Sequence, residues 1–464
     1  MTRISERNNP SPMSDMPEMI DSSQERFRTP LLAFALGLTT LAFIVAKTGR
    51  DALFFQGSGG LLQLPLVYIN IAAASLPLAL IFVKAMKVWG ARPARIGILA
   101  LAATVMGSAA PFLTPGDNAL MLVIFIFIPA TFGLVFASLW LLASDIFEDT
   151  EKTASARAFS KIGAGTLAGG MTGGIVSKAL ASHLNPNWLI FLAAGVIIGI
   201  IALVSYIHAR FPAKVASKRA DPQKKTPGFL SPLQNRYSAT LIAISMTGAL
   251  AGLLIDFQFY AAAAGANMGS KGNAGFFANF YILLNFSSLL LQLFATPKIQ
   301  DKVGLRGGLM VLPLALIGGA TFVTAAATAL SRSVLRVTEG GLRSSVHRSI
   351  WEQAFIHVDP SERSSVKIAV DGIAARIAEA IGAVAILLWL KEVAAEGVLP
   401  MPLNTNWIGW ATLGTVAVWL AVTQKMRVET RQDRARLTSP ALDLDCERFP
   451  DQCPCTTELG KGVA

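Results

Sequence analysis

Charged residues are scarce in this sequence. Asp, Glu, Lys and Arg make up only 15% of its 464 residues, whereas soluble proteins contain about 25%. Hydrophobic residues make up 53% of the chain. This balance excludes an ordinary soluble protein and is typical of a chain that is integral to a membrane.

Cysteine and histidine are missing from the places where metal or nucleophilic chemistry would need them. All three cysteines lie near the C-terminus, in "CERFPDQCPC", which has too few ligands for a closed zinc site. The four histidines are scattered near expected loops, and no Walker-type loop is present. We therefore expect no enzyme activity, no metal, no cofactor and no ATP-driven pump. The three cysteines are Cys446, Cys453 and Cys455.

The N-terminus lacks a secretory signal. Residues 1–28 have no short apolar core and no small-residue cleavage site, so we expect the first apolar run to be retained. Runs of about 20 apolar residues, enough to cross about 30 Å of hydrocarbon as a helix, predict twelve transmembrane segments. They cover residues 30–52, 61–83, 96–113, 119–142, 161–181, 188–208, 238–264, 275–296, 308–326, 327–346, 366–390 and 407–424. The ninth and tenth have no clear polar loop between them.

Basic loops predict the orientation. Alternate loops such as "VKAMKVWGARPAR" and "PKIQDKVGLR" are rich in Lys and Arg, whereas "TPGDN" and "HLNPN" on the other side are not. Since basic loops stay on the cytoplasmic side, both termini are predicted in the cytoplasm. The basic residues of the cytoplasmic loops also account for most of the net charge of +11. We therefore expect no nucleic-acid partner.

A polar connector divides the segments into six and six. Asp51 in "GRDALFF" and Asp256 in "LIDFQFY" occupy corresponding places in the two halves, as do Asn70 and Asn285. This register predicts an all-α integral membrane protein of twelve transmembrane helices in two six-helix pseudo-repeats, the major facilitator fold, which works by alternating access. We expect a cytoplasmic tail over residues 1–29, bundles over 30–208 and 237–424, a cytoplasmic connector over 209–236 and a second cytoplasmic tail over 425–464.

Ionisable residues within these segments are costly in lipid, so we expect them to face water or one another. Asp256 either pairs with a basic residue of a neighbouring helix or contacts a coupling cation or substrate. Lys47, Arg50 and Asp51 share one helix face. If the helix begins near Pro30, Lys47 lies about 25 Å along it. The triplet is then either an interfacial anchor or part of a cavity.

The tenth segment carries a charged stripe. Its members are Arg332, Arg336, Glu339 and Arg343, spaced by 4, 3 and 4 residues, which confines them to one helix face. Because arginine binds phosphate with two parallel hydrogen bonds, the stripe indicates a polyanionic substrate. The alternative is that the two outer arginines lie at the membrane interfaces and leave a structural Arg336–Glu339 pair.

The fifth and eleventh segments carry further candidates. Gly165, Gly169 and Gly173 repeat every four residues and favour close helix packing over phosphate binding. Near the cytoplasmic start of the fifth segment, Lys161 either anchors the helix or meets an incoming anion. In the eleventh segment Asp371 precedes Arg376 and Glu379, which share a face at i, i+3 and are expected to neutralise each other.

Several separated motifs resemble the ATP/ADP translocase family of plastids and intracellular bacteria and its wider bacterial relatives. They are "KTGRDALFF", "SARAFSKIGAGTLAGG", "LLIDFQFYAAAAGA" and "RVTEGGLRSSVHRSIWEQAF". The resemblance implies twelve spans of major facilitator type and exchange of nucleotides, with membrane-embedded charges that handle the phosphates. The positions matching the family's motifs are Lys47, Arg50, Asp51, Asp256, Arg336, Glu339, Gly163 and Gly165. Gly340, Ser344 and Lys161 depart from the motifs.

We therefore expect a monomeric secondary transporter of a bacterial inner membrane that moves an anionic, nucleotide-like metabolite. The expected substrate-binding residues are Lys47, Arg50, Lys161, Arg336 and Arg343. The expected coupling or gating residues are Asp51, Asp256, Glu339, Asp371, Arg376 and Glu379, and the expected packing residues are Gly163, Gly165, Gly169 and Gly173. Two alternatives are a proton-coupled exporter of another solute and a non-transporting sensor or scaffold that binds partners or anionic lipid through its basic segments.

Overall fold

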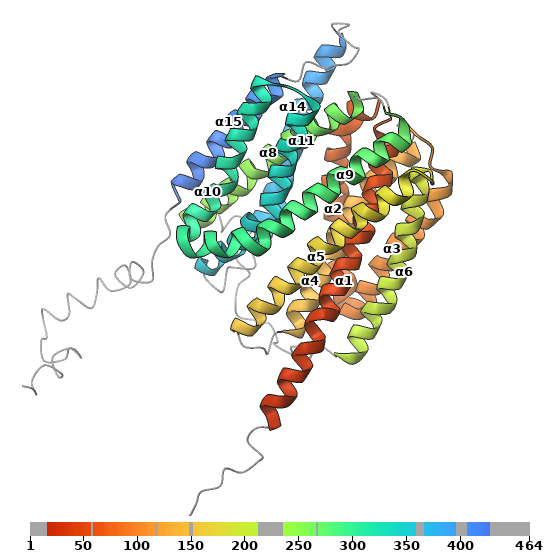
Figure 1. Cartoon of the computed structure of the whole chain (residues 1–464), viewed down its shortest axis with the longest axis vertical. Helices are drawn as coiled ribbons and strands as arrows, with labels where there is room; N and C mark the ends of the chain where they lie inside the picture. Colours follow the sequence, from red (N-terminus) through yellow and green to blue (C-terminus); the bar gives the residue numbers. More distant parts are fainter. Residues whose placement is uncertain are drawn as a thin grey trace, which may run out of the picture.

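The computed structural model describes residues 16–56, 59–116, 119–147, 152–211, 235–265, 268–358, 366–395 and 406–426, and these residues form helices joined by short connections (Figure 1). The long helices are α1 (Met16–Phe54), α2 (Gly59–Trp89), α3 (Ala91–Ala109), α4 (Ala119–Ile146), α5 (Lys152–Ala181), α6 (Pro186–Arg210), α8 (Arg236–Gly265), α9 (Gly269–Leu290), α10 (Thr296–Ala325), α11 (Ala329–Leu342), α14 (Ala375–Ala395) and α15 (Asn406–Gln424). The shorter ones are η1 (Ala110–Phe112), η2 (Leu291–Ala295), η3 (Arg343–His347), α12 (Arg348–Ala354), η4 (Phe355–His357) and η5 (Ile368–Ala374).

Each of the twelve predicted segments falls on one of these helices or on an unbroken run of them, within a residue or two at the ends. Within the described residues, nine helices are long and apolar enough to cross a membrane by themselves. Several helices extend beyond the predicted segments, for example α5, which begins at Lys152 and not at residue 161. The first segment is predicted to begin at residue 30, but α1 begins at Met16 and contains Pro30 within it. Hydropathy marks only the apolar part of a helix, whereas backbone hydrogen bonds continue through polar residues.

The ninth and tenth segments are separated by a cap that the apolar pattern does not reveal. The backbone leaves the helical region at Ala326, and α11 then begins after Thr328. The side chain of Thr328 accepts a hydrogen bond from the backbone N–H of Ser331, and the Ser331 hydroxyl accepts one from the Thr328 N–H. This reciprocal capping box satisfies two of the free N–H groups at the helix start, so a three-residue connection is enough.

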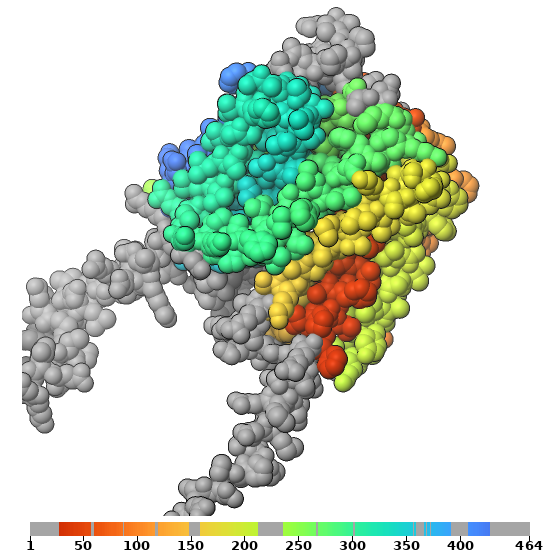
Figure 2. All heavy atoms as spheres, viewed as in Figure 1, coloured from red at the N-terminus to blue at the C-terminus, as the bar shows by residue number. Residues whose placement is uncertain are grey.

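The helices form two groups with one seam between them. Helices α1 to α6 pack on one another, as do α8 to α15, and the groups meet chiefly where α5 lies along α9 and where α2 lies along α14. The α5–α9 contact is visible where the yellow and green helices run side by side (Figures 1 and 2). Most of the connector predicted over residues 209–236 lies outside the described residues, as do the three tail cysteines.

Glycines of α5 allow backbone contact with α1. A Cβ on Gly165 would meet Ala33 at 2.9 Å, and a Cβ on Gly169 would meet the carbonyl oxygen of Gly37 at 2.0 Å. A Cβ on Gly173 would come within 2.8 Å of the Leu41 carbonyl oxygen. Only a residue without a side chain permits this approach.

Gly163, by contrast, has open space around its Cβ position. It is the one predicted packing glycine that does not lie in close contact with a neighbouring helix. Two further glycines of α5, Gly170 and Gly174, face α9 across the seam.

Candidate functional site

A cavity of about 780 Å³ lies between the two groups of helices. Residues of α1, α2, α4 and α5 line one side of it, and residues of α8, α9, α11, α14 and α15 line the other. We call the end of the molecule where α1 and α8 begin the inner end, and the end where these helices finish the outer end. The cavity brings together charged residues that are separated by more than 300 positions in the sequence, from Lys47 to Glu379.

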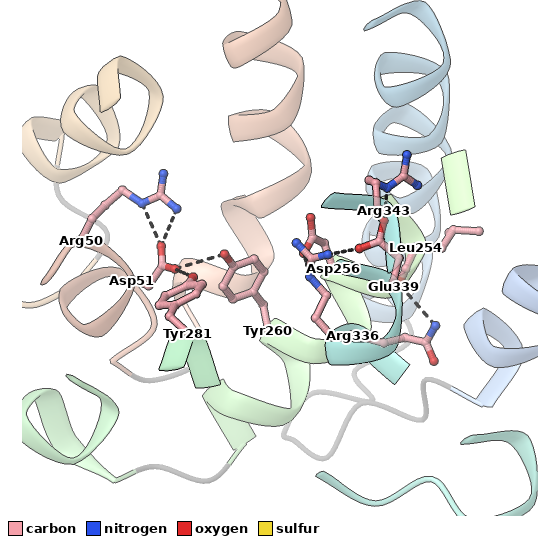
Figure 3. A network of polar contacts seen from close by, with 10 residues as sticks. Arg50, Asp51, Leu254, Asp256, Tyr260, Tyr281, Arg336, Glu339 and Arg343 are labelled. Carbon is pink, nitrogen blue, oxygen red and sulfur yellow. Dashed lines mark hydrogen bonds and ion pairs between the residues drawn. The ribbon is translucent and has the colours of Figure 1, made fainter. Parts of the chain in front are cut away.

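The first group of charges lies on α8, α11 and η3. The Nε atom of Arg336 is 2.5 Å from Oδ1 of Asp256, and the same guanidinium also contacts Glu339 (Figure 3). Glu339 accepts a second hydrogen bond, from Arg343, whose Nη2 donates to the carbonyl oxygen of Gly248 at 2.8 Å. Two guanidiniums and two carboxylates thus form a chain that is neutral overall. Of the two alternatives for Asp256, the structure shows pairing with a basic residue of a neighbouring helix.

The second group joins the two halves of the molecule. Arg50 donates from Nε to Oδ1 of the adjacent Asp51 at 2.8 Å, and its guanidinium lies 3.8 Å from the ring centroid of Phe125. The other carboxylate oxygen of Asp51 accepts hydrogen bonds from Tyr260, at 3.1 Å, and from Tyr281, at 2.6 Å (Figure 3). Asp51 belongs to α1 and the two tyrosines to α8 and α9, so these hydrogen bonds cross the seam.

Aromatic side chains close the outer end beside Asp51. The rings of Phe55 and Tyr260 stack with their centroids 4.4 Å apart, and Phe277 lies 6.2 Å from Phe55. The Nδ2 of Asn273 donates to the carbonyl oxygen of Phe55 at 3.2 Å. All of these contacts again link α1 to α8 or α9. These ring contacts and hydrogen bonds close the two halves on each other at the outer end, where Asp51 is fully buried.

Exposed side chains lie at the inner end of the cavity. Its lining residues include Arg348 and Arg376, whose side chains are 61% and 48% exposed, whereas Arg50 at the outer end is 4% exposed. Arg376 pairs with Glu379 at 2.7 Å, the neutralising pair that their spacing predicts. Asp371 accepts a hydrogen bond from the indole N–H of Trp351 at 2.8 Å. Among the described residues, the cavity is thus bounded by buried contacts at the outer end and by exposed side chains at the inner end.

Lys47 differs from its charged neighbours. It lines the cavity, and the charges of Arg50, Asp51, Asp256 and Arg336 all act on it. No carboxylate lies within 4.0 Å of its Nζ among the residues that the structure describes, and its nearest ring is Tyr281, with the centroid 4.9 Å from Nζ. The cavity role, and not the interfacial anchor, is the alternative that the structure supports for Lys47.

One predicted binding residue, Lys161, and the first residue of the charged stripe, Arg332, lie away from the cavity. Lys161 is exposed on α5 and does not line it. Arg332, at the start of the charged stripe, does not line it either, although Arg343 at the other end does. Only Arg336, Glu339 and Arg343 of the stripe therefore line the cavity. Gln258, two residues after Asp256, donates to the hydroxyl of Thr412 at 2.8 Å and does not line the cavity.

Tyrosines are the site residues that the sequence reasoning missed. Tyr68, Tyr260 and Tyr281 all line the cavity. The chain has only five tyrosines, and four of them lie within predicted apolar segments: these three and Tyr206. Their placement was the available signal, although it does not distinguish Tyr206 from the three in the cavity. A hydroxyl in an apolar helix needs a partner in the same way as a charge does.

Comparison with known proteins supports the fold. No family model and no curated protein matches the sequence. Among solved structures, a point mutant of the nucleoside transporter NupG aligns with a TM-score of 0.62 at 13% identity, over 87% of this chain and 99% of that one. Unmutated NupG aligns with a TM-score of 0.57 at 12% identity, over 87% of this chain and 98% of that one. The POT family transporter PepTSo aligns with a TM-score of 0.61 at 10% identity, over 88% and 98%. The chain is thus an all-α, multi-pass membrane protein with the major facilitator fold, as the sequence predicts.

Proposed function

We propose that this protein is a secondary transporter that moves a small anionic metabolite by alternating access. The observation that carries the proposal is the cavity between the two helical groups, bounded at one end by buried contacts across the seam and at the other by exposed side chains. In this fold the halves rock around a central binding site, so a cavity with one closed end corresponds to one state of the cycle. We further propose that the inner end faces the cytoplasm, as the basic loops predict.

The substrate is proposed to be anionic because the deep part of the cavity has an excess of positive charge. Three arginines and Lys47 lie there with only three carboxylates, Asp51, Asp256 and Glu339. Nucleotide-like compounds, including an ATP/ADP exchange, are the first candidates. Their support is the sequence resemblance to nucleotide translocases and the likeness of the fold to a nucleoside transporter.

The residues have two kinds of proposed role. Lys47, Arg336 and Arg343 line the cavity and are placed to contact the substrate. Asp51, Asp256 and Glu339 hold cations or tyrosines in the present state, and rocking of the halves changes which partners they can reach. Lys161 lies outside the cavity, so we propose no contact with bound substrate for it in this state.

Exchange by purified protein in lipid vesicles tests the proposal. Vesicles loaded with unlabelled ATP, ADP, AMP or adenosine are given the labelled compound outside, and uptake is compared with that of empty vesicles and of vesicles without protein. Uptake that depends on internal substrate supports exchange. Uptake driven by a pH gradient without internal substrate supports proton coupling instead. If folded protein moves no member of a broad panel of organic anions, the transport proposal is wrong.

A further inference from the structure

Every arginine that lines the cavity already has a carboxylate partner. The ion pairs, with N–O distances in parentheses, are Arg50–Asp51 (2.5 Å), Arg336–Asp256 (2.5 Å), Arg348–Glu352 (2.9 Å) and Arg376–Glu379 (2.7 Å), and Arg343 pairs with Glu339. Such pairs are nearly neutral to a ligand, because its negative charge would have to displace a carboxylate that is already in place. The number of arginines therefore overstates the capacity of the cavity for anions.

Lys47 and the hydroxyl of Tyr68 have no polar partner among the described residues. Two other lining atoms also lack one, Nδ1 of His347 and the indole N–H of Trp419, but these two rings pack against each other with centroids 5.6 Å apart. Lys47 has no ion pair among the described residues, and its ammonium group has three N–H donors. The hydroxyl oxygen of Tyr68 is buried with no hydrogen-bond partner in the described part of the chain. Both residues line the cavity, from α1 and α2 respectively. Two donors that lack acceptors in one cavity indicate that the ligand supplies the acceptor oxygens.

The remaining lining is largely aromatic and apolar. Rings from both halves face the cavity, namely Phe43, Tyr68, Phe125, Phe136, Tyr260, Tyr281, Trp351 and Trp419. Such a lining stabilises a flat apolar group and does not solvate additional charge. Trp419 and Phe125 are themselves covered by Arg343 and Arg50, respectively, at 5.7 and 3.8 Å from guanidinium carbon to ring centroid.

From these observations we propose that the substrate carries one net negative charge, bound by Lys47 and Tyr68, together with a planar apolar part. This inference rests on the proposed transport function and narrows its substrate class to compounds with a single negative charge, so among the nucleotide candidates it argues against ATP and ADP. A carboxylate and a phosphodiester both present one charge with two acceptor oxygens. A di- or triphosphate adds negative charges for which the cavity has no unpaired cation, and in a low-dielectric site each unmatched charge is costly.

Two ligand pairs test the charge rule with the ring system held constant. Benzoate and phthalate differ by one carboxylate, and cyclic AMP and ATP differ in the number of phosphate charges. Binding and vesicle uptake of each are measured for the wild-type protein. In one of the two pairs we expect the singly charged compound to bind at least about tenfold more tightly: benzoate more tightly than phthalate, or cyclic AMP more tightly than ATP. One unmatched buried charge costs at least that factor in affinity. Whichever pair shows the preference identifies carboxylate or phosphodiester chemistry.

Substitutions then assign the preference to the two donors. Lys47→Gln should weaken binding of the preferred monoanion by about tenfold to a hundredfold, and Tyr68→Phe by about threefold to tenfold. Lys84→Gln is the matched control, because Lys84 is exposed on α2 and does not line the cavity. Thermal unfolding of each purified variant shows that it is folded. If Lys47→Gln does not fold, the wild-type charge preference still decides the question.

Two results would overturn the inference and leave the transport function standing. One is preferential uptake of phthalate, ADP or ATP over their singly charged counterparts. The other is an effect of folded Lys47→Gln no larger than that of Lys84→Gln on a transported monoanion. Absence of uptake for every compound in both panels has a different meaning, because it removes the proposed transport function itself.

Discussion

Oδ2 of Asp51 accepts a hydrogen bond from the hydroxyl of Tyr281 at 2.6 Å, and this bond joins the two halves of the molecule. Asp256, which occupies the corresponding place in the second half, pairs with Arg336 inside its own half. The two aspartates occupy corresponding places in the repeat but have different kinds of partner in this state. Asp51 accepts hydrogen bonds across the seam, whereas Asp256 pairs with a cation of its own half.

Loss of the Tyr281 hydroxyl should favour opening of the outer end. Tyr281→Phe removes a hydrogen bond to a charged group, worth about 1.5 kcal/mol, which shifts the open-to-closed ratio by roughly tenfold. Spin labels at Gln56→Cys and Lys271→Cys, exposed at the outer ends of α1 and α9, report the opening as a longer label-to-label distance. The native cysteines, all in the tail, are replaced first.

Tyr237→Phe is the control for that experiment. The Tyr237 hydroxyl donates to the carbonyl oxygen of Ala354 at 2.8 Å, within the second half and near the inner end. Its loss costs a hydrogen bond without touching the outer seam. An equal change in outer distance in both variants would show that the Tyr281 bond is not specific to closure.

Removal of Arg336 should lower the amount of folded protein. Arg336→Ala leaves Asp256 without a cation in a partly buried position, a loss of about 3–5 kcal/mol. The double variant with Asp256→Ala should recover much of the abundance, because no unpaired charge remains. Glu339→Ala is a poorer second change, since Glu339 also neutralises Arg343. Abundance in membranes and thermal unfolding of purified protein measure the effect.

Uptake separates the structural role of Arg336 from a binding role. If Arg336 contacts the substrate, the double variant with Asp256→Ala should be abundant but inactive. Arg376→Ala is a comparison variant, because that side chain is 48% exposed and its pair with Glu379 is worth about 1 kcal/mol or less. Normal abundance of the Arg336→Ala single variant would contradict the expected cost of the orphaned carboxylate.

The glycines of α5 offer a matched pair of substitutions. Gly169→Ala should destabilise the protein by about 1–3 kcal/mol, because the new methyl group would overlap the backbone of Gly37. Gly163→Ala, six residues earlier on the same helix, meets open space and should be neutral or stabilise by up to about 1 kcal/mol through helix propensity. Thermal unfolding in detergent compares the two. Equal melting temperatures would argue against the close α1–α5 contact.

The seam between α5 and α9 is testable by a double-mutant cycle. A Cβ on Gly170 would lie 2.2 Å from Oδ1 of Asn285, so Gly170→Ala should loosen this crossing and lower stability. Truncation of the facing side chain in Asn285→Ala makes room for the methyl group. The two changes should therefore be non-additive by about 0.5–3 kcal/mol, measured by unfolding of the four proteins. Additive effects would show that these residues do not meet.

Hydropathy and register predicted much of the architecture. Apolar runs located the twelve helical segments, and the correspondence of Asp51 with Asp256 predicted a duplicated fold, because both signals are local and repeat along the chain. The start of α1 at Met16 was not predicted, since a helix continues beyond its apolar part. The capping box at Thr328 also lay outside what hydropathy detects.

The sequence by itself determined that charges must be sheltered within apolar helices, because lipid cannot solvate them. Only the tertiary structure decided which charge meets which. It pairs Asp256 with Arg336, gives Asp51 two tyrosines from the other half, and leaves Lys47 without an ion pair among the described residues. These outcomes depend on helix rotation and crossing over distances of a few ångströms. Such geometry arises from packing between segments far apart in the chain, and no local pattern encodes it.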